Sequence, residues 1–547
     1  MADFDIETDV LVIGGGLGGL RAAIAARSAG VHVLVVVKGK LGRSGCSAIT
    51  TAGYAACLAD GDDSAARFAA DTLKGGGGIG DRALVEILCH EASREVDWLE
   101  SLGARFQRKG EKFRRTPSGD HSRPRVLLSA NNLGTDLTAP LVDHAEAVGV
   151  AKLEGAMATR LIADDDGVAG AVAYDFRTGR FLTIAAGATI LATGGAGRLF
   201  PLSSNPNDVT GDGFALAAEA GAVLRDMEFI QFYPWRCIDP FDKARVSIQP
   251  STFVFGARLF NAQGERFMLG FNPDGGEIST RDIAARGIFH EIRSGRGVGG
   301  GVRLDASALS QAAFAAANPK IARYLARNGI DHRRYPFIVA PEAHFWMGGV
   351  AIDPDAATSA PRLFAAGETA GGVHGGNRLN SNALPETQVF GARAGRRAAE
   401  VARSGRRGAA PAARASPVRP GGLNARELGE LHAKLQARMG EALGILRRGA
   451  DMEEGLAYVR ELDERLAYQG AADAAAIRPW FELRFLSRTA ELSLLSALFR
   501  TESRAAHFRE DYPATDDANW AGSVSIVPQG ATFALRFVRK KATDHVA

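Results

Sequence analysis

Residues 9–20 read DVLVIGGGLGGL, and this stretch decides the fold. The apolar run at residues 10–13 is typical of a buried strand, and the Ala-rich segment at residues 20–28 predicts a helix. The turn between them has the spacing G-x-G-x-x-G with one further glycine, at Gly14, Gly16, Gly18 and Gly19. Such a turn lets the backbone approach a pyrophosphate, to which the helix N-terminus offers free N–H groups. A second apolar run at residues 31–37 completes a βαβ unit, so we expect a dinucleotide-binding domain.

The end of the second predicted strand argues against NAD. In the generic dinucleotide-binding pattern an acidic residue binds the ribose at this point. This chain has Val37 and Lys38 there instead. On the generic pattern alone, NAD is therefore disfavoured as the ligand.

Composition narrows the class of protein. The 547 residues include 65 basic and 62 acidic side chains, a balance that gives no reason to expect nucleic acid as a partner. The four cysteines form no C-x-x-C pair, which excludes an iron–sulfur cluster held by the usual spacings and predicts no metal. Without a disulfide framework, a basic leader or an apolar run of about 20 residues, we expect a cytoplasmic chain with reduced thiols.

Changes in sequence character suggest how the chain is divided. Apolar segments at 188–192 and 363–368 each end in glycines and read as further strands of the nucleotide-binding domain. The Arg-rich segment between them reads as an insertion, and the helical spacing of Leu428, Leu431, Leu435 and Met439 predicts a final helical domain. The expected parts are a discontinuous nucleotide-binding domain (1–233 and 344–402), an inserted domain (234–343), an Arg, Ala, Pro and Gly-rich linker (403–422), and a helical domain with tail (423–547).

Many further motifs occur in one order from about residue 9 to about residue 520. They include residues 42–45 (GRSG), 192–197 (ATGGAG), 210–213 (TGDG), 279–282 (STRD), 366–368 (AGE), 374–379 (HGGNRL) and 502–511 (ESRAAHFRED). In this order they resemble the flavoprotein subunits of succinate dehydrogenase and fumarate reductase. That family also includes L-aspartate oxidase and the α subunit of adenylylsulfate reductase. The resemblance implies an α/β fold: a Rossmann-like FAD-binding domain, an inserted α+β capping domain that closes over the flavin, and a C-terminal helical domain.

The resemblance also implies which residues bind FAD. The family's second strand ends in a Ser-Lys-like pair, so Lys38 is no objection to FAD. Glu368 is expected to contact the ribose, and residues 381–384 are expected to lie along the flavin. The predicted cofactor residues beyond the first glycines are Lys38, Gly42, Arg43, Ser44, Gly45, Thr193, Gly194, Asp212, Glu368, Ser381, Ala383 and Leu384. Membrane-bound respiratory members carry a flavin-linking His at the position of Gly45, so we expect non-covalent FAD here.

The substrate residues depart from the family pattern. Dicarboxylate-binding members use two pairs of side chains, and His344 and Arg378 resemble one of these pairs. Where the family's second pair and its neighbouring Glu are expected, this chain has Tyr233, Val254 and Phe255. A second carboxylate facing these groups would lose hydrogen bonds and be desolvated, at a cost of several kcal/mol, roughly. Our hypothesis is a small enoate substrate with one carboxylate and a less polar far end, for example an aromatic one.

Arg281 matches the family's catalytic arginine. The implied reaction transfers hydride between flavin N5 and the β carbon while Arg281 protonates the α carbon. His344 and Arg378 would draw electron density into the carboxylate. In the family a Glu and an Arg return the proton to the catalytic arginine. Here Arg258 remains but Phe255 replaces the Glu, so the sequence does not show how Arg281 is reprotonated. The alternative structural interpretation of Arg281 is an ion pair with Asp282 or with a neighbour at the domain joint. For His121, a structural hydrogen bond and a place near the flavin are equally compatible with the sequence.

Three functions remain open from the sequence. One is an FAD-dependent enoate reductase or carboxylate dehydrogenase acting on CH–CH groups. Another is a flavoprotein like the α subunit of adenylylsulfate reductase, which would need an iron–sulfur partner. The third is an electron-carrying flavoprotein subunit of an iron–sulfur complex, although a carrier has no need of Arg281, His344 and Arg378. L-Aspartate oxidase is disfavoured because it uses both carboxylate-binding pairs.

Overall fold

The computed structural model describes residues 4–58, 62–239, 246–404, 416–530 and 532–540. Its largest sheet carries the predicted βαβ unit at its centre, and five of its seven strands run parallel. In spatial order the strands are β8 (Ala151–Glu154), β2 (Val33–Val37), β1 (Ile6–Ile13), β11 (Arg180–Leu191), β10 (Gly167–Asp175) and β9 (Ala156–Asp164), with β18 (Leu363–Ala365) paired to the end of β11. All five residues of β2 are buried, as expected for a parallel strand covered on both faces.

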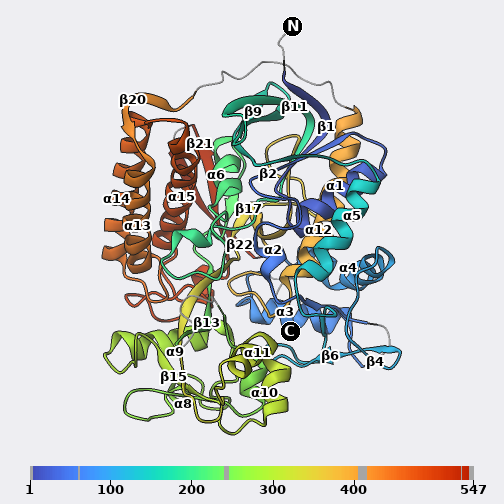
Figure 1. Ribbon diagram of the computed structural model, residues 1–547. Helices are drawn as coiled ribbons and strands as arrows, with labels where there is room; N and C mark the ends of the chain where they lie inside the picture. The colour runs from blue at the N-terminus through green and yellow to red at the C-terminus, as the bar shows by residue number, and fades with distance from the viewer. Residues whose placement is uncertain (1–3, 59–61, 240–245, 405–415, 531, 541–547) are drawn as a thin grey trace.

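Helices cover this sheet, mostly on the right of Figure 1. Helix α1 follows β1 and packs against α12 and α5, and α12 also packs against α4. The helices and short strands of this part are α1 (Leu17–Ser28), α2 (Cys46–Ile49), β3 (Gly53–Ala55), α3 (Ala65–Gly75), α4 (Arg82–Ser101), β4 (Arg108–Lys109), β5 (Lys112–Phe113), β6 (Arg115–Thr116), β7 (Val126–Leu128), α5 (Thr135–Ala147), α6 (Asp212–Glu219) and α12 (Ala383–Ser404).

Two long antiparallel strands carry the chain into and out of the inserted part, which lies at the bottom of Figure 1. These strands, β13 (Ile230–Asp239) and β16 (Phe337–Trp346), run through the boundaries predicted at 233/234 and 343/344. The other elements are α7 (Ser251–Val254), β14 (Arg258–Phe260), α8 (Met268–Phe271), α9 (Arg281–Arg293), β15 (Val302–Asp305), α10 (Gln311–Ala317) and α11 (Pro319–Arg327). The insertion has its own apolar core, which includes Trp235, Phe253 and Phe337.

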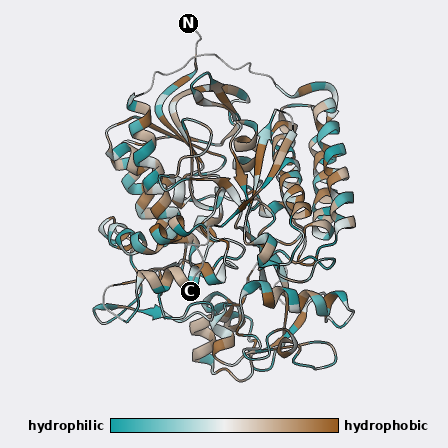
Figure 2. Cartoon of the chain, turned by 180° about the vertical axis from the view of Figure 1, so that it is seen from behind, coloured by the Kyte–Doolittle hydropathy of each residue, from teal (hydrophilic) through white to brown (hydrophobic). Residues whose placement is uncertain are grey.

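Three long helices form most of the C-terminal part, on the left of Figure 1. They are α13 (Ala425–Ala442), α14 (Gly449–Gln469) and α15 (Ala474–Phe499), and Figure 2 shows apolar and polar residues alternating along them. The predicted spacing is observed, since Leu428, Leu431, Leu435 and Met439 are all buried on α13. Of the predicted linker, residues 405–415 lie outside the described residues.

A β-hairpin after the last helices was not anticipated. Strands β21 (Gly522–Gln529) and β22 (Thr532–Arg539) follow the short helix α16 (Asp517–Trp520). Strand β21 pairs with β12 (Leu224–Arg225), so the chain end extends a sheet begun by the nucleotide-binding part. The remaining members of that sheet are β17 (Gly349–Ala351) and β19 (Ala370–Gly371), and β20 (Val418–Leu423) precedes α13.

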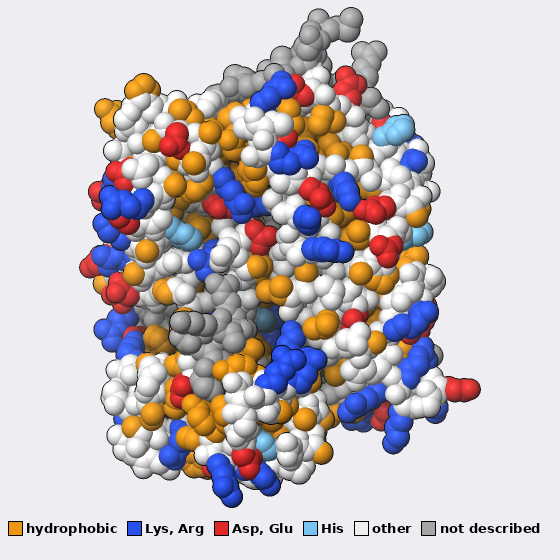
Figure 3. Space-filling model, in the orientation of Figure 1, with side chains coloured by type: hydrophobic (Ala, Val, Ile, Leu, Met, Phe, Trp, Pro, Cys, Tyr) orange, Lys and Arg blue, Asp and Glu red, His pale blue; other side chains and the backbone are white. Residues whose placement is uncertain are grey.

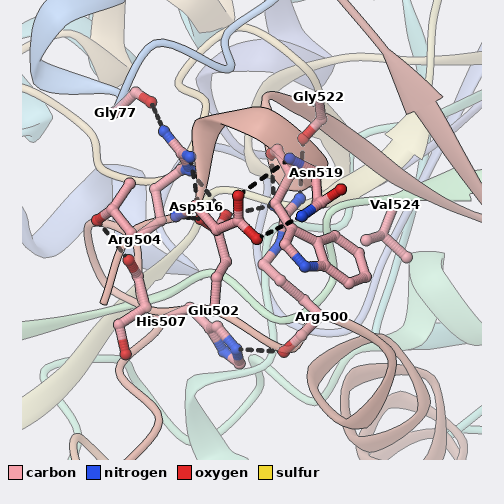
Figure 4. Close-up of polar contacts among 12 residues, drawn as sticks. Gly77, Arg500, Glu502, Arg504, His507, Asp516, Asn519, Gly522 and Val524 are labelled. Atoms are coloured by element: carbon pink, nitrogen blue, oxygen red, sulfur yellow. Dashed lines mark hydrogen bonds and ion pairs between the residues drawn. The ribbon is translucent and has the colours of Figure 1, made fainter. Parts of the chain in front are cut away.

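The motif at residues 502–511 is a buried polar network that joins these parts (Figure 4). Arg500 is fully buried and donates to Glu228, to Glu502 and to the carbonyl of Gly522. Arg504 donates to Glu502 and to the Gly77 carbonyl at 3.0 Å. The Ala506 amide donates to the carbonyl of Gly376, two residues before Arg378. Because breaking a buried charge pair costs about 3–5 kcal/mol, this network holds the loop around Arg378 in place.

Neither a membrane span nor a metal site is found in the described part of the chain. None of its helices has both the length and the apolar character needed to cross a bilayer. No group of three or more His, Cys, Asp and Glu side chains is arranged there to hold a metal ion. On the face drawn in Figure 3, basic and acidic side chains are interspersed.

The glycine-rich turn generates a stability prediction. A Cβ on Gly19 would lie 1.9 Å from the Gly14 carbonyl oxygen, whereas one on Gly18 would make ordinary contacts of 3.6 Å or more. We expect Gly19→Ala to lower the stability of the apoprotein by about 1–3 kcal/mol, since an overpacked core strains the backbone. Gly18→Ala is the matched control and should leave the thermal unfolding midpoint nearly unchanged. Equal midpoints for the two variants would contradict the packing described for this turn.

Candidate active site

A large cavity of about 920 Å³ lies at the carboxyl ends of the central parallel strands. Its walls include the residues that follow β1, β2, β11 and β18. Ligands of open α/β sheets bind at this edge. The cavity continues to the insertion, where α9 and the strands β13 and β16 contribute residues. It is thus large enough, and placed correctly, for a dinucleotide and a small second ligand.

Most of the predicted cofactor residues line this cavity. They are Gly14, Gly16, Gly18, Lys38, Ser44, Gly45, Thr193, Gly194, Asp212, Glu368, Ser381, Ala383 and Leu384. Gly45 and Gly194 have positive φ angles of 76° and 78°, and nothing lies within 4 Å of where a Cβ would stand. Their backbone is therefore open to close approach by a ligand. Gly16 caps α1 without a side-chain hydrogen bond, which leaves backbone donors at this helix end. The donor set fits FAD.

Three predicted cofactor residues do not line the cavity. Gly19 packs against the Gly14 backbone within the turn. Gly42 has a φ of 65°, and its amide donates to the Gly15 carbonyl at 2.9 Å, so it supports the glycine-rich turn without lining the cavity. Arg43 is exposed. A motif match alone cannot separate residues that touch a ligand from those that hold the loop around it.

Lys38 is held by carboxylates from two other segments. Its Nζ lies 2.9 Å from Asp212 and 3.2 Å from Glu482 of α15, and it donates to Thr210 Oγ1 at 2.6 Å. Burial lowers the pKa of Lys38, but the two carboxylates outweigh this effect and raise it above its ordinary value. Lys38 therefore connects the nucleotide site to the C-terminal helices. Glu482 gives no signal in the sequence, because the contact spans 444 residues.

Glu368 lies on the cavity wall beside Trp346. Its Oε1 accepts from the Trp346 amide at 3.0 Å, and burial raises the pKa of the Glu368 carboxyl to about 7. A carboxyl at this pKa can accept or donate hydrogen bonds at neutral pH. Its position is consistent with the predicted contact to the FAD ribose.

The raised pKa of Glu368 predicts a pH-dependent stability of the apoprotein. The folded form binds this proton more tightly than the unfolded chain, whose pKa is near 4.5. The contribution is complete below pH 4.5 and is lost as the pH rises to about 7. We expect Glu368→Gln to flatten this part of the profile, measured as thermal unfolding midpoints from pH 4.5 to 8. Glu400→Gln, which removes a surface carboxylate paired with Arg397, is the control. Identical slopes in wild type and Glu368→Gln would contradict the assignment.

Two buried arginines without carboxylate partners stand at the other end of the cavity. Arg281 donates to Gln231 Oε1 and to Asn380 Oδ1, both at 2.8 Å, and Arg378 donates to the same Gln231 oxygen at 3.0 Å. Neither guanidinium has an ion-pair partner among the described residues, and the Nε of each has no hydrogen-bond partner there. The alternative ion pair of Arg281 with Asp282 is not formed. The arrangement leaves two buried cations whose remaining donors could bind an anion.

Electrostatics at this site favour an incoming anion. Burial, reinforced by the neighbouring charge of Arg281, lowers the pKa of Arg378 to about 9. Burial likewise lowers the pKa of Arg281. Burial and both arginines lower the pKa of His344 well below its ordinary range, so its imidazole is neutral at pH 7. Its Nδ1 lies 2.7 Å from Ser204 Oγ. A carboxylate bound here would relieve the repulsion between the two cations.

The wall facing the arginines is mostly apolar or neutral. The Tyr233 hydroxyl donates to the Ile248 carbonyl at 2.6 Å, and its ring lies 5.1 Å from that of His344. Val254 and Phe255 line the cavity and are 42% and 49% exposed, so their apolar surfaces face the space a ligand would fill. Gln249 and Lys320 also line this region, and the sequence motifs did not point to either.

Arg258 is the one predicted substrate residue that does not line the cavity. It donates to the Ala257 carbonyl at 2.8 Å, and its Nε lies 4.0 Å from Glu277. A proton path from Arg258 to Arg281 is therefore not seen. His121 is hydrogen-bonded at both ring nitrogens, to the Asn380 carbonyl and to Arg125, and does not line this cavity, as expected of a structural histidine.

Sequence reasoning missed the residues that hold the arginines. Gln231 bonds to both of them, and its Nε2 donates to Asn377 and to the Arg378 carbonyl, both at 2.8 Å. Gln231 is part of the Gln-Phe motif, but nothing in a motif shows that one amide oxygen spaces two guanidinium groups. Asn380 and Ser204 were likewise visible only once the fold brought distant segments together.

Comparison with known proteins agrees with this geometry. Residues 9–384 match the model of an FAD binding domain, and residues 432–543 match a fumarate reductase flavoprotein C-terminal domain. The chain is 35% identical to a fumarate reductase flavoprotein subunit of Mycobacterium tuberculosis (94% of this chain, 94% of that one) and 36% identical to an L-aspartate oxidase of Caulobacter vibrioides (92% and 94%). The FrdA chain of E. coli quinol fumarate reductase superposes with a TM-score of 0.88 at 28% identity, covering 98% of this chain and 97% of that one.

Proposed function

Because this chain belongs to the FAD-dependent oxidoreductase family of fumarate reductase and succinate dehydrogenase flavoproteins, we propose that it transfers hydride between FAD and a small enoate with one carboxylate. The observation that carries the proposal is the pair of buried guanidinium groups of Arg281 and Arg378, which have no carboxylate partner among the described residues, at one end of the cavity. The described residues of the facing wall include no second pair of this kind. The Tyr233 hydroxyl donates to a backbone carbonyl, and Val254 and Phe255 are apolar.

The position of each residue in the cavity indicates its part in the proposed reaction. Arg378 binds the substrate carboxylate and neutral His344 lies beside it, so charge that develops on the carboxylate is stabilised by a fixed cation. Arg281 donates a proton to the carbon next to the carboxylate. Its lowered pKa makes the proton easier to release than from an arginine in water. Bound FAD supplies or accepts the hydride. Gln231 fixes the separation of the two arginines through one oxygen atom.

The cofactor is proposed to be held without a covalent bond. Gly45 has no side chain that could link to the flavin, and the position opens into the cavity. An iron–sulfur protein is a further proposed partner, because relatives named as subunits work within larger assemblies. Retention of Arg281, His344 and Arg378 around one cavity favours an enzyme over a protein that only carries electrons.

The substrate proposal is tested by reoxidation of the flavin. The holoenzyme is reduced chemically without oxygen, and its absorbance is followed as single acceptors are added. We expect rapid reoxidation by a cinnamate- or urocanate-like enoate and little by fumarate. In Phe255→Lys a cation is added to the apolar wall, so the rate with fumarate should rise by about tenfold or more. Leu269→Lys is the control, because Leu269 is similarly exposed on the insertion but does not line the cavity.

Two results would contradict the proposal. Rapid reoxidation of the wild-type flavin by fumarate would show that the second carboxylate is accommodated, as in an ordinary dicarboxylate member of the family. Reoxidation by none of the carboxylates, with electrons passing only to artificial acceptors, would favour the electron-carrying alternative.

A further inference from the structure

A second, small cavity lies behind Arg281. Its volume is about 20 Å³, and Arg281 lines both this cavity and the large one. Asp120, Trp235, Glu277, Ser279 and Asn380 are among its other walls. Ser118, Pro250, Val254 and Asn380 also line both cavities, so the small cavity, or chamber, adjoins the large one along a wall that includes Arg281.

Three residues that line the small cavity carry buried polar atoms without partners. Trp235 Nε1, Ser279 Oγ and Arg281 Nε have no hydrogen-bond partner in the part of the chain that the structure describes. A buried donor left unpaired costs about 1–3 kcal/mol. Proteins satisfy such groups with an internal water, which needs about 10–15 Å³ and two to four polar partners. The chamber meets both conditions for one water molecule.

Two carboxylates share this chamber, and they differ in their partners. Glu277 is paired with Arg266, whose Nη2 lies 2.7 Å from its Oε2. Asp120 accepts from the Asn380 amide at 2.6 Å and from the Ser118 hydroxyl, and it has no ion-pair partner among the described residues. The Asn380 side chain in turn accepts from Arg281. Asp120 is half-buried and follows the exposed Gly119. Burial raises the pKa of the Asp120 carboxyl, but the neighbouring His121 and the hydrogen bonds that Asp120 accepts outweigh burial and hold this pKa below its ordinary value.

We propose that Asp120, acting through one water molecule in this chamber, returns a proton to Arg281 after each turnover, an inference that rests on the proposed function. Arg281 gives one proton to the α carbon of the substrate and becomes neutral. Asp120, a carboxylate at rest, takes a proton from solvent and passes it to the water, which gives one of its own protons to Arg281. The net change is one solvent proton in the product for each hydride transferred. Asp120 thus supplies a proton-return path to Arg281. The family's Glu and Arg supply this path, but Phe255 and Arg258 do not supply it here.

With this relay, the first turnover differs from those that follow. Arg281 is already protonated in the resting enzyme, so Asp120→Asn should reoxidise chemically reduced flavin with wild-type kinetics in a single turnover. With an excess of enoate and reduced methyl viologen as electron donor, kcat should fall by about 10²-fold with KM nearly unchanged. The solvent deuterium isotope effect on kcat should increase, and Asp120→Glu should recover much of the rate. Asp62→Asn, which removes a surface carboxylate paired with Arg123, is the control.

Structural and kinetic outcomes decide the proposal separately. A crystal structure of the holoenzyme should show a water that is hydrogen-bonded to Arg281 Nε and to the Asp120 carboxylate, and its absence would overturn the relay. Equal slowing of the first and later turnovers in Asp120→Asn would mean that Asp120 only positions Asn380, and unchanged steady-state kinetics would mean that it has no role. If wild type reduces no enoate at all, the proposed function fails and the relay falls with it.

Discussion

The structure depends on one constraint: two guanidinium groups are buried side by side, and no carboxylate of the described chain neutralises either. Arg281 and Arg378 share a single oxygen of Gln231, and their mutual repulsion and burial depress the pKa of Arg378 to about 9. Leaving such charges uncompensated is expensive. An anion bound beside them would offset this cost, and a lowered pKa eases release of a proton from an arginine. The proposed reaction at a carbon next to a carboxylate uses both properties.

The fold supplies this arrangement from distant segments. Arg281 begins α9 of the insertion, Gln231 lies on β13 at the join, and Arg378 lies in a loop of the nucleotide-binding part. That loop is held by the buried network of residues 500–506, in which the Ala506 amide donates to the Gly376 carbonyl. The helices of the C-terminal part also reach the nucleotide site, where Glu482 pairs with Lys38. Each part of the chain therefore contributes contacts that shape the cavity.

The fold class, the family and the cofactor could be predicted from the sequence because they rest on local patterns. The strand, turn and helix at residues 9–28 and the buried spacing of α13 are properties of neighbouring residues, and both are confirmed. The hairpin β21–β22 was not foreseen, because its pairing with β12 joins residues about 300 positions apart, as in Leu224 with Ile526. Among site residues, the motif matches named Arg281, His344 and Arg378, which line one cavity in the structure. They also named Arg258, whose hydrogen bonds lie away from that cavity. Gln231, Asn380 and Asp120 act through contacts between segments, so no linear signal marks them.

The central claim is that Arg378 binds the one carboxylate of the substrate, that Arg281 faces the carbon next to it, and that the rest of the substrate lies against Tyr233, Val254 and Phe255. The most direct measurement is a crystal structure of the oxidised holoenzyme soaked with a saturated monocarboxylate such as 3-phenylpropanoate. We expect the carboxylate within hydrogen-bond distance of the Arg378 guanidinium, the carbon next to it beside Arg281, and the ring against the apolar wall. A ligand bound in the reverse direction, or a carboxylate bound at Lys320 with the arginines still bonded only to Gln231 and Asn380, would contradict the claim.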